Sequence, residues 1–407
     1  MKQGDKNSLP NGWEMKKLGE VCDFKSGNTI NSKLEKSEGE IIYAKVGDMN
    51  LEGNEEYITI SSRYVDKNEI KENQIIVAGS IIFPKRGGAI ATNKKRRILK
   101  PTIIDLNTMA LVPTKIINQD YLYYWFLQID LSKLSNGTSI PQINNYSFDE
   151  VYISYPLSFE EQQSIVAKLD EAFEAIEKAK ANAEQNLKNA KELFDSYLQA
   201  IFENKGKDWK EVPLADLATF RNGMNFTKSS NGEVIKIVGV RDFQNSFWVP
   251  FENLDSVIID GELNDIDLLR EDDILAVRSN GNPELIGRTL LAGKFEGKIS
   301  HSGFTIRIRL NCKNVLPVYL CIYLKTQKVR KELINRGNGV GIKSLNQGSL
   351  ASLLIHLPPV SEQQSIVQKL DALSSETKKL EANYQKKLED LEELKKSILQ
   401  KAFSGQL

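Results

Sequence analysis

Hydrophobic positions recur along two segments of the chain at the spacing of one helical face. Between Ile165 and Ile201 they follow one another in steps of three and four residues, and the segment from Ile366 to Ala402 repeats the same order of steps. Steps of three and four place side chains on one side of an α-helix. At ~1.5 Å per residue, about 40 residues form a rod about 60 Å long. The pattern therefore predicts two long amphipathic helices.

Each predicted helix would expose its apolar stripe to water if it stood alone. Proline residues (Pro156; Pro358 and Pro359) and a capping serine (Ser158 or Ser361) mark where each helix starts. The stripe extends beyond what one globular block could cover, and the other helix is the nearest candidate partner. We therefore expect an intramolecular antiparallel coiled coil. The alternative is that each helix packs only on its own block.

The same two segments begin with an internal repeat. Residues 161–170 read EQQSIVAKLD and residues 362–371 read EQQSIVQKLD, so nine of the ten positions are identical at an offset of 201. Further anchors recur at an offset of 196: Trp13 and Trp209, Leu18 and Leu214, Phe24 and Phe220, Gly27 and Gly223. A repeat of this kind indicates a duplicated architecture. The chain therefore consists of two copies of one unit, each a globular block followed by a long helix.

The two blocks are predicted to be strand-rich. Segments such as 40–48 and 305–310 are rich in β-forming residues and are bounded by turn residues. Apolar clusters at matching places, 121–127 and 319–324, are predicted to be core helices rather than base-stacking platforms, because aromatic residues usually pack in cores. The sequence thus predicts an α+β fold with four parts: a globular block at 1–155, a helix at 156–205, a second globular block at 206–355 and a second helix at 356–407.

Composition narrows the class of protein. With 407 residues, 41% hydrophobic and 27% charged, the chain has the make-up of a soluble protein of more than one domain. No apolar run approaches the ~18 residues of a membrane-spanning helix, and we expect a cytoplasmic protein. Three cysteines without a CxxC pair argue against a disulfide framework. Two widely separated histidines, His301 and His356, argue against zinc or Ser-His-Asp chemistry. We expect no metal site and no catalytic residue.

The total charge of the chain does not indicate a nucleic-acid binder, whereas the positions of the basic residues are more informative. The net charge is zero, whereas residues 1–155 carry 20 basic and 19 acidic residues and residues 206–355 carry 20 and 17. The basic residues cluster at 84–88 and 93–100 in the first block and at 278–282 in the second. A strand followed by basic residues and glycines suits a loop that approaches DNA, because glycine allows close backbone contact while Arg and Lys reach phosphates or guanine edges. A solvated surface loop would have the same composition.

The repeated segments and the block openings together resemble the DNA-specificity subunit of type I restriction-modification systems. The resemblance spans the whole chain and is carried by 161–170, 362–371, Trp13 to Gly27, Trp209 to Gly223 and 394–405. It implies two globular target-recognition domains, related by a pseudo-two-fold axis and separated by two long antiparallel spacer helices. It also implies a non-catalytic chain that works with double-stranded DNA, two modification (methyltransferase) subunits and restriction subunits. S-adenosylmethionine, ATP and Mg²⁺ would be cofactors of those partner subunits.

The same resemblance implies that each domain reads one short half-site. Helices about 60 Å long would bring half-sites separated by roughly one to two DNA turns of ~34 Å within reach. The loops differ between the blocks, with KRGG at 85–88 and RSNG at 278–281. We therefore expect an asymmetric target interrupted by an unspecified gap. Because residues 8–13 resemble residues 205–209, which follow the first helix, we also expect the two termini to lie close together and to tolerate circular permutation.

Candidate contact residues come from the basic loops and from the repeated helix starts. The candidates for DNA contact are Lys85, Arg86, Lys94, Lys95, Arg96, Arg97, Arg278, Asn280, Asn282 and Arg288. The candidates for docking of modification subunits are Gln162, Gln163, Gln363 and Gln364, with the outward helix faces. Residues that touch bases should change specificity when replaced, whereas those that touch phosphates should weaken all sites alike.

Three other functions compete with this interpretation. A methyltransferase would need an Asn-Pro-Pro-aromatic or Asp-Pro-Pro-aromatic motif and a glycine-rich cofactor loop, and the sequence contains neither. A Mg²⁺-dependent nuclease could use Asp48 with Glu69 and Lys71, but the second block offers no counterpart. A coiled-coil scaffold with protein-binding blocks would use the helices equally well. The basic loops favour DNA over the scaffold, and a salt series distinguishes the two.

Overall fold

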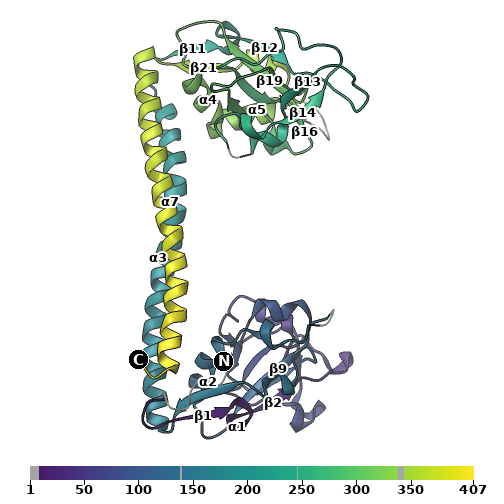
Figure 1. The fold of residues 1–407 in the computed structure, drawn as a ribbon, viewed down its shortest axis with the longest axis vertical. Helices are drawn as coiled ribbons and strands as arrows, with labels where there is room; N and C mark the ends of the chain where they lie inside the picture. Colours follow the sequence, from purple (N-terminus) through teal and green to yellow (C-terminus); the bar gives the residue numbers. More distant parts are fainter. Residues whose placement is uncertain (1–8, 138–139, 245, 338–342) are drawn as a thin grey trace. The chain divides into compact units, whose positions relative to one another are not determined.

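The structure, a computed structural model, describes residues 9–137, 140–244, 246–337 and 343–407. The chain divides into two compact units, one made of Met1–Glu184 with Lys386–Leu407 and the other of Gln185–Gln385. Each unit therefore contains one globular block and a part of each long helix (Figure 1). Among the described residues, no helix combines the length and the hydropathy needed to cross a bilayer.

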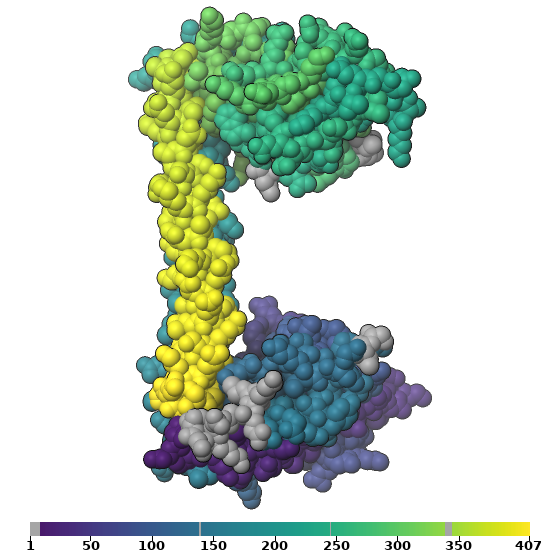
Figure 2. Space-filling view, in the orientation of Figure 1, coloured from purple at the N-terminus to yellow at the C-terminus, as the bar shows by residue number. Residues whose placement is uncertain are grey.

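The two predicted long helices are present and run antiparallel. Helix α3 covers Phe159–Glu203 and helix α7 covers Val360–Phe403. In the first unit the early part of α3 meets the late part of α7, where ion pairs join Lys180 to Glu392 at 2.8 Å and Glu177 to Lys395 at 3.0 Å. In the space-filling view α7, in yellow, lies along α3 in each unit (Figure 2).

Each helix also ends against the block that it does not follow in sequence. The core of the first unit contains Leu169 and Phe173 of α3 together with Leu399 and Phe403 of α7. The core of the second unit contains Leu198 and Phe202 of α3 together with Ile366 and Leu370 of α7. The intramolecular antiparallel pair is thus confirmed. The alternative, in which each helix packs only on its own block, is wrong because both cores contain residues of both helices.

The first block is built from two sheets and a separate strand pair. The pair joins β1 (Trp13–Lys17) to β10 (Tyr152–Pro156). The larger sheet has the strand order β2 (Cys22–Ser26), β9 (Thr108–Pro113), β6 (Ile81–Pro84), β7 (Arg96–Ile98), β4 (Tyr57–Ile58). The smaller sheet has the order β5 (Tyr64–Val65), β3 (Ile41–Ala44), β8 (Thr102–Ile104). Two short helices complete the block, α1 (Leu18–Val21) and α2 (Gln119–Leu127).

The second block repeats this plan. Its strand pair is β11 (Lys210–Pro213) with β21 (Leu354–Leu357). One sheet has the order β12 (Ala218–Asn222), β19 (Thr305–Leu310), β15 (Ile274–Val277), β17 (Thr289–Leu291), and another has β14 (Asp255–Ile258), β13 (Val234–Val238), β18 (Ile299–His301). A further pair joins β16 (Ser279–Asn280) to β20 (Lys343–Ser344), and the helices are α4 (Pro317–Lys325), α5 (Gln327–Arg336) and α6 (Gln347–Ala351). The predicted α+β class with two strand-rich blocks and two long helices is confirmed.

The repeated glycine marks a close backbone approach in both blocks. A Cβ on Gly27 would lie 2.0 Å from the carbonyl oxygen of Asp105, and a Cβ on Gly223 would lie 2.2 Å from that of Ser302. The amides of the two glycines donate to the carbonyls of Thr108 and Thr305 respectively. No side chain fits at either position without moving backbone, which explains why glycine stands at both.

The apolar clusters of the sequence are core helices, as predicted. Helix α2 starts at Asn118, whose side chain caps it by accepting from the amides of Asp120 and Tyr121. The side chains from Tyr121 to Phe126 in α2 and from Tyr319 to Leu324 in α4 are buried. The matching tyrosines fasten matching strands: the hydroxyl of Tyr121 donates to the carbonyl of Ser154, and that of Tyr319 to the carbonyl of His356. These aromatic residues are therefore packed and do not form a stacking surface.

The two ends of the described chain meet in the first unit. A Cβ on Gly405 would lie 2.2 Å from the Cγ of Pro10, so the two residues are in contact. Nearby, the Ser154 hydroxyl donates to the carbonyl of Phe403 at 2.8 Å. The predicted proximity of the termini is confirmed for these residues.

Candidate nucleic-acid interface

The basic loop of the first block leaves the buried strand β6 and is held by backbone pairing. We call residues 85–88 the β6 loop. The carbonyl of Lys85 accepts from the amide of Ile143 at 2.8 Å, and the amide of Gly87 donates to the carbonyl of Pro141 at 2.8 Å. Gly87 has a φ of 74°, a left-handed conformation that favours glycine. The loop is therefore ordered by a segment about 55 residues downstream in the chain.

The corresponding loop of the second block is held in the same way. We call residues 278–282 the β15 loop. The carbonyl of Arg278 accepts from the amide of Leu345 at 2.8 Å, and Ser279 and Asn280 pair with β20. The guanidinium of Arg278 donates to the carbonyl of Gly303 at 3.2 Å. The two loops predicted from sequence thus occupy equivalent places in the two blocks.

The β6 loop presents two cations. Arg86 is exposed and Lys85 is half-buried. Among the described residues, neither side chain has a hydrogen-bond or ion-pair partner. Burial, followed by the nearby charge of Arg86, lowers the pKa of Lys85 from its ordinary value. Both charges are therefore available to an anionic ligand.

The basic run after this loop, from Lys94 to Arg97, contains both buried and partly exposed side chains. The side chain of Lys95 is only 2% exposed, and its ammonium donates to the carbonyl of Ile129 at 2.7 Å and to the amide oxygen of Asn93 at 3.0 Å. It also lies 5.2 Å from the centre of the Phe126 ring. Burial lowers the pKa of Lys95 to about 7. This placement argues against the DNA contact that we expected of Lys95.

Arg97 is also turned inward. Its side chain forms ion pairs with Glu56 and, at 2.7 Å, with Asp120, and it lies between the rings of Tyr57 and Tyr123. With its charge matched by two carboxylates, Arg97 is a structural residue, and the expected DNA contact does not fit this position. Lys95 directly precedes β7 and Arg97 is the middle residue of that strand, and both residues are buried.

The other two residues of the run lie closer to the surface. The ammonium of Lys94 contacts the amide oxygen of Asn50. The guanidinium of Arg96 donates to the carbonyls of Lys95 at 3.0 Å and Met49 at 3.1 Å. Neither is paired with a carboxylate among the residues described, so both remain candidates for DNA contact.

In the second block the predicted residues shape the β15 loop and the turn that follows it. The amide oxygen of Asn280 accepts from the backbone of Asn282 at 2.8 Å, and that of Asn282 accepts from the backbone of Glu284 at 3.0 Å. Arg288 donates to the carbonyl of Gln244 at 2.9 Å. Sequence reasoning missed two further cations, Lys325 and Arg330, which lie around the same hollow as Arg288. They come from α4 and α5, and no local motif marks them.

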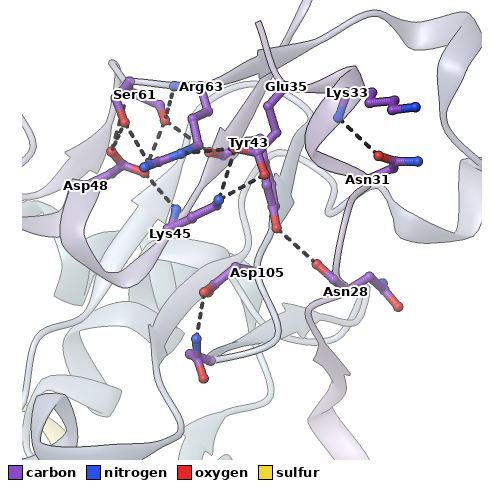
Figure 3. Close-up of polar contacts among 12 residues, drawn as sticks. Asn28, Asn31, Lys33, Glu35, Tyr43, Lys45, Asp48, Ser61, Arg63 and Asp105 are labelled. Atoms are coloured by element: carbon purple, nitrogen blue, oxygen red, sulfur yellow. Dashed lines mark hydrogen bonds and ion pairs between the residues drawn. The ribbon is translucent and has the colours of Figure 1, made fainter.

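A polar network in the first block accounts for the carboxylate of the nuclease alternative (Figure 3). Asp48 is nearly buried and accepts from the amide of Lys45 at 2.7 Å and from the hydroxyl of Ser61 at 3.1 Å. Close by, Glu35 pairs with Lys45 at 3.0 Å and with Arg63 at 3.1 Å. The role of Asp48 is thus to fasten its own turn.

The second block places a carboxylate in the same structural role as Asp48, and the other carboxylate of the nuclease alternative also has a structural partner. Asp242 accepts from the amide of Gly239 at 2.8 Å, as Asp48 does from Lys45. Glu69, the other carboxylate of the nuclease alternative, pairs with Lys36 at 3.2 Å. Within the described part of the chain, no three His, Cys, Asp or Glu residues are placed to hold a metal ion.

The glutamines expected to dock partners divide into two kinds. Gln162 is fully buried: its amide oxygen accepts from the backbone of Asn118 at 2.7 Å, and its NH2 group donates to the carbonyls of Ile116 at 3.2 Å and Pro156 at 2.9 Å. Gln363 makes the same three bonds in the second block, to the backbone of Leu316, Asn314 and Pro358. These two glutamines fasten each helix start to its block, and partner docking does not fit them.

The neighbouring residues complete this joint. Gln163 and Gln364 are exposed. The indole of Trp13 donates to the carboxylate of Glu161 at 3.0 Å, and that of Trp209 to the carboxylate of Glu362 at 2.9 Å. The repeated sequence therefore encodes a repeated joint between a helix and a block.

The two histidines have structural positions. His301 is buried, its Nδ1 lies 2.9 Å from the Thr305 hydroxyl, and burial lowers its pKa to about 3. Burial also lowers the pKa of His356. Neither ring lies in a cluster of metal ligands among the described residues.

Known proteins share both the sequence pattern and the fold. Residues 10–185 and 206–390 match the family model described as type I restriction modification DNA specificity domain. The specificity subunit of the type I restriction enzyme StySPI from Salmonella potsdam is 27% identical over 425 residues, which cover 99% of this chain and 91% of the relative.

Solved structures show the same fold. The HsdS subunit from Thermoanaerobacter tengcongensis has a TM-score of 0.66 at 18% identity, with 98% of both chains covered. A chain from a structural study of complex assembly and conformational transition in the type I R-M system has a TM-score of 0.74 at 19% identity, with 98% of this chain and 99% of that chain covered. Because the family model matches both halves of the duplication and together most of the chain, this protein belongs to the type I restriction-modification DNA specificity family.

Proposed function

We propose that this chain is the DNA-reading subunit of a type I restriction-modification complex and recognises an asymmetric target in two parts. Residues 1–155 and 206–355 are the two target-recognition domains, and each reads one half-site. The observation that supports this most is the duplicated fold: the β6 loop and the β15 loop leave equivalent strands but carry different side chains. Two loops at equivalent positions but with different side chains would read two different half-sites, because base recognition depends on the side chains that reach the base edges.

The DNA contacts are assigned to those candidates that the fold leaves accessible. In the first domain they are Lys85, Arg86, Lys94 and Arg96, and in the second domain Arg278, Asn280, Asn282 and Arg288. Arginine can bind guanine through two hydrogen bonds, asparagine can bind adenine, and lysine can contact either guanine or phosphate. We assign base reading to Arg86 and the β15 loop, and phosphate contact to Lys85 and Lys94.

The helices, residues 156–205 and 356–407, space the domains and dock two modification subunits. Large apolar side chains remain exposed on them: Leu193, Tyr197, Leu380 and Leu394. Exposed apolar side chains on long helices suit a helical partner. The restriction subunits would join the same assembly, and S-adenosylmethionine, ATP and Mg²⁺ would serve those partners. This chain would need no cofactor of its own and would act with the complex in the cytoplasm.

Methylome sequencing of the host, with and without this gene, tests the proposal. The expected result is one modified motif with two unlike specified halves and a constant gap, which disappears when the gene is deleted. A single contiguous palindrome, or an unchanged methylome, would contradict it. If the blocks instead bind protein, DNA affinity of the purified complex should lack the steep decrease with salt that phosphate contacts produce.

A further inference from the structure

Three cationic side chains share one open hollow in the second block. Arg288, just before β17, Lys325 at the end of α4 and Arg330 in α5 line a hollow of about 350 Å³. Phe247 lies against it, with the Lys325 ammonium 5.4 Å from the centre of its ring. The three residues are 37 and 5 positions apart in sequence, so only the fold brings them together.

None of the three charges is matched by a carboxylate within the described part of the chain. Arg288 donates to the carbonyl of Gln244 at 2.9 Å, Lys325 to that of Ser246 at 3.2 Å, and Arg330 to that of Glu284 at 2.7 Å. Carbonyl groups satisfy hydrogen bonds but carry no net charge. The three positive charges are therefore only weakly compensated in a half-buried place: the Glu284 carboxylate acts on Arg330 without forming an ion pair with it.

Burial and mutual repulsion lower the pKa of two of these cations. Burial lowers the pKa of Lys325, and the charges of Arg330 and Arg288 lower it further. Burial and the charge of Arg288 likewise lower the pKa of Arg330, against a smaller opposing effect of the Glu284 carboxylate. A nearby anion would offset both effects, because it favours the charged form of each group.

The first block shows how a buried cation is compensated within this chain. Arg97, on strand β7, is paired with both Glu56 and Asp120. The three cations of the hollow have no such ion pair among the described residues, and this contrast points to an external anion as their partner.

We propose that this hollow binds a phosphate group of the DNA backbone beside the half-site that the β15 loop reads. The inference rests on the proposed function and adds Lys325 and Arg330 to the second domain's DNA contacts. Arg288 and Arg330 both donate to the carbonyl of Glu284, in the turn that follows the β15 loop. A phosphate held here would therefore fix the position of that loop over the bases. Guanidinium and ammonium groups are the usual protein partners of phosphate.

The test is the salt dependence of DNA binding by the full chain assembled with its modification subunits. Lys325→Gln removes one charge but can still donate to Ser246. Each neutralised phosphate contributes about 0.9 to the slope of log affinity against log salt, so the slope should fall by about 0.9 and the affinity by about five-fold at 0.15 M salt. The loss should be equal for the target duplex and an unrelated duplex, because phosphates carry no sequence information. Lys325→Arg should retain the wild-type slope.

Lys331→Gln is the matched control, since Lys331 is exposed on α5, the helix that carries Arg330, and does not line the hollow. Its slope should stay at the wild-type value. An unchanged slope in Lys325→Gln, or an equal change in Lys331→Gln, would overturn the phosphate site. If Lys325→Gln does not fold, judged by thermal unfolding, Arg288→Gln is measured in its place with the same expected loss of slope. Failure of the proposed function is distinct: the wild-type complex itself would then show no salt-dependent DNA binding, and the phosphate site would fall with it.

Discussion

Gln162 offers the sharpest test of how the first block is joined to its helix. Its amide makes three hydrogen bonds to the backbone, with Asn118, Ile116 and Pro156, and the side chain is 0% exposed. Gln162→Met keeps the size of the side chain but removes all three bonds. The backbone groups would then be left without partners in the interior.

The magnitude follows from the enclosure of these groups. A buried polar group without a partner costs about 1–3 kcal/mol. The bond to Pro156 is buried and the other two are partly buried. We count the full cost for the buried carbonyl of Pro156 and a part of the cost for the two partly buried groups. The free energy of unfolding of the first unit should then fall by about 3 to 5 kcal/mol.

Urea unfolding combined with amide hydrogen exchange measures this loss of stability, because exchange reports the opening of the two units separately. The expected result is faster exchange in the strands of the first block and unchanged exchange in the second. Gln163→Met, on the exposed neighbour, should change stability by less than about 0.5 kcal/mol. The reasoning is refuted if Gln162→Met matches Gln163→Met in stability, and refuted also if its main effect is loss of modification subunits from a fully stable chain.

Three further outcomes are expected. Burial lowers the pKa of Lys95 to about 7 in the folded chain, against 10.5 for a free lysine, so between these pH values the unfolded chain binds more protons and the free energy of unfolding should rise with pH. Urea unfolding at pH 7 and pH 9 measures this rise, and Lys95→Met should abolish it. A rise that persists in Lys95→Met would exclude Lys95 as its source. Arg97→Met should lower the free energy of unfolding by about 1 to 2 kcal/mol, since it leaves two partly exposed carboxylates without their cation. Arg86→Gln should instead weaken DNA binding in a titration and leave stability unchanged. The opposite pair of results would contradict our separation of the two arginines. Gly27→Ala should lower the free energy of unfolding by about 2 kcal/mol or more, because its Cβ would meet a backbone oxygen. Gly47→Ala is the control, since Gly47 has open space around it, and thermal unfolding compares the two variants. Equal melting temperatures would show that the backbone at Gly27 can shift to accept a side chain.

The residues expected to contact DNA or partner subunits were the hardest to predict from the sequence. The run from Lys94 to Arg97 has the composition of one basic patch, yet the fold buries Lys95 and Arg97 and leaves Lys94 and Arg96 nearer the surface. Composition reports how much charge a segment has but not which way each side chain points. The same reason explains Gln162 and Gln163, which are neighbours in sequence with opposite exposure.

The sequence by itself determined the duplication, the two long helices and the strand-rich blocks between them. Helical period and repeated anchors such as Gly27 and Gly223 are local properties, set by backbone geometry and side-chain spacing, and they can be read without knowing the neighbours. Only the tertiary structure decided which helix ends share a core and which cations face inward. It also assembled Arg288, Lys325 and Arg330 around one hollow. Such outcomes depend on burial and on charges far apart in the chain, which act on each other only after folding has brought them together.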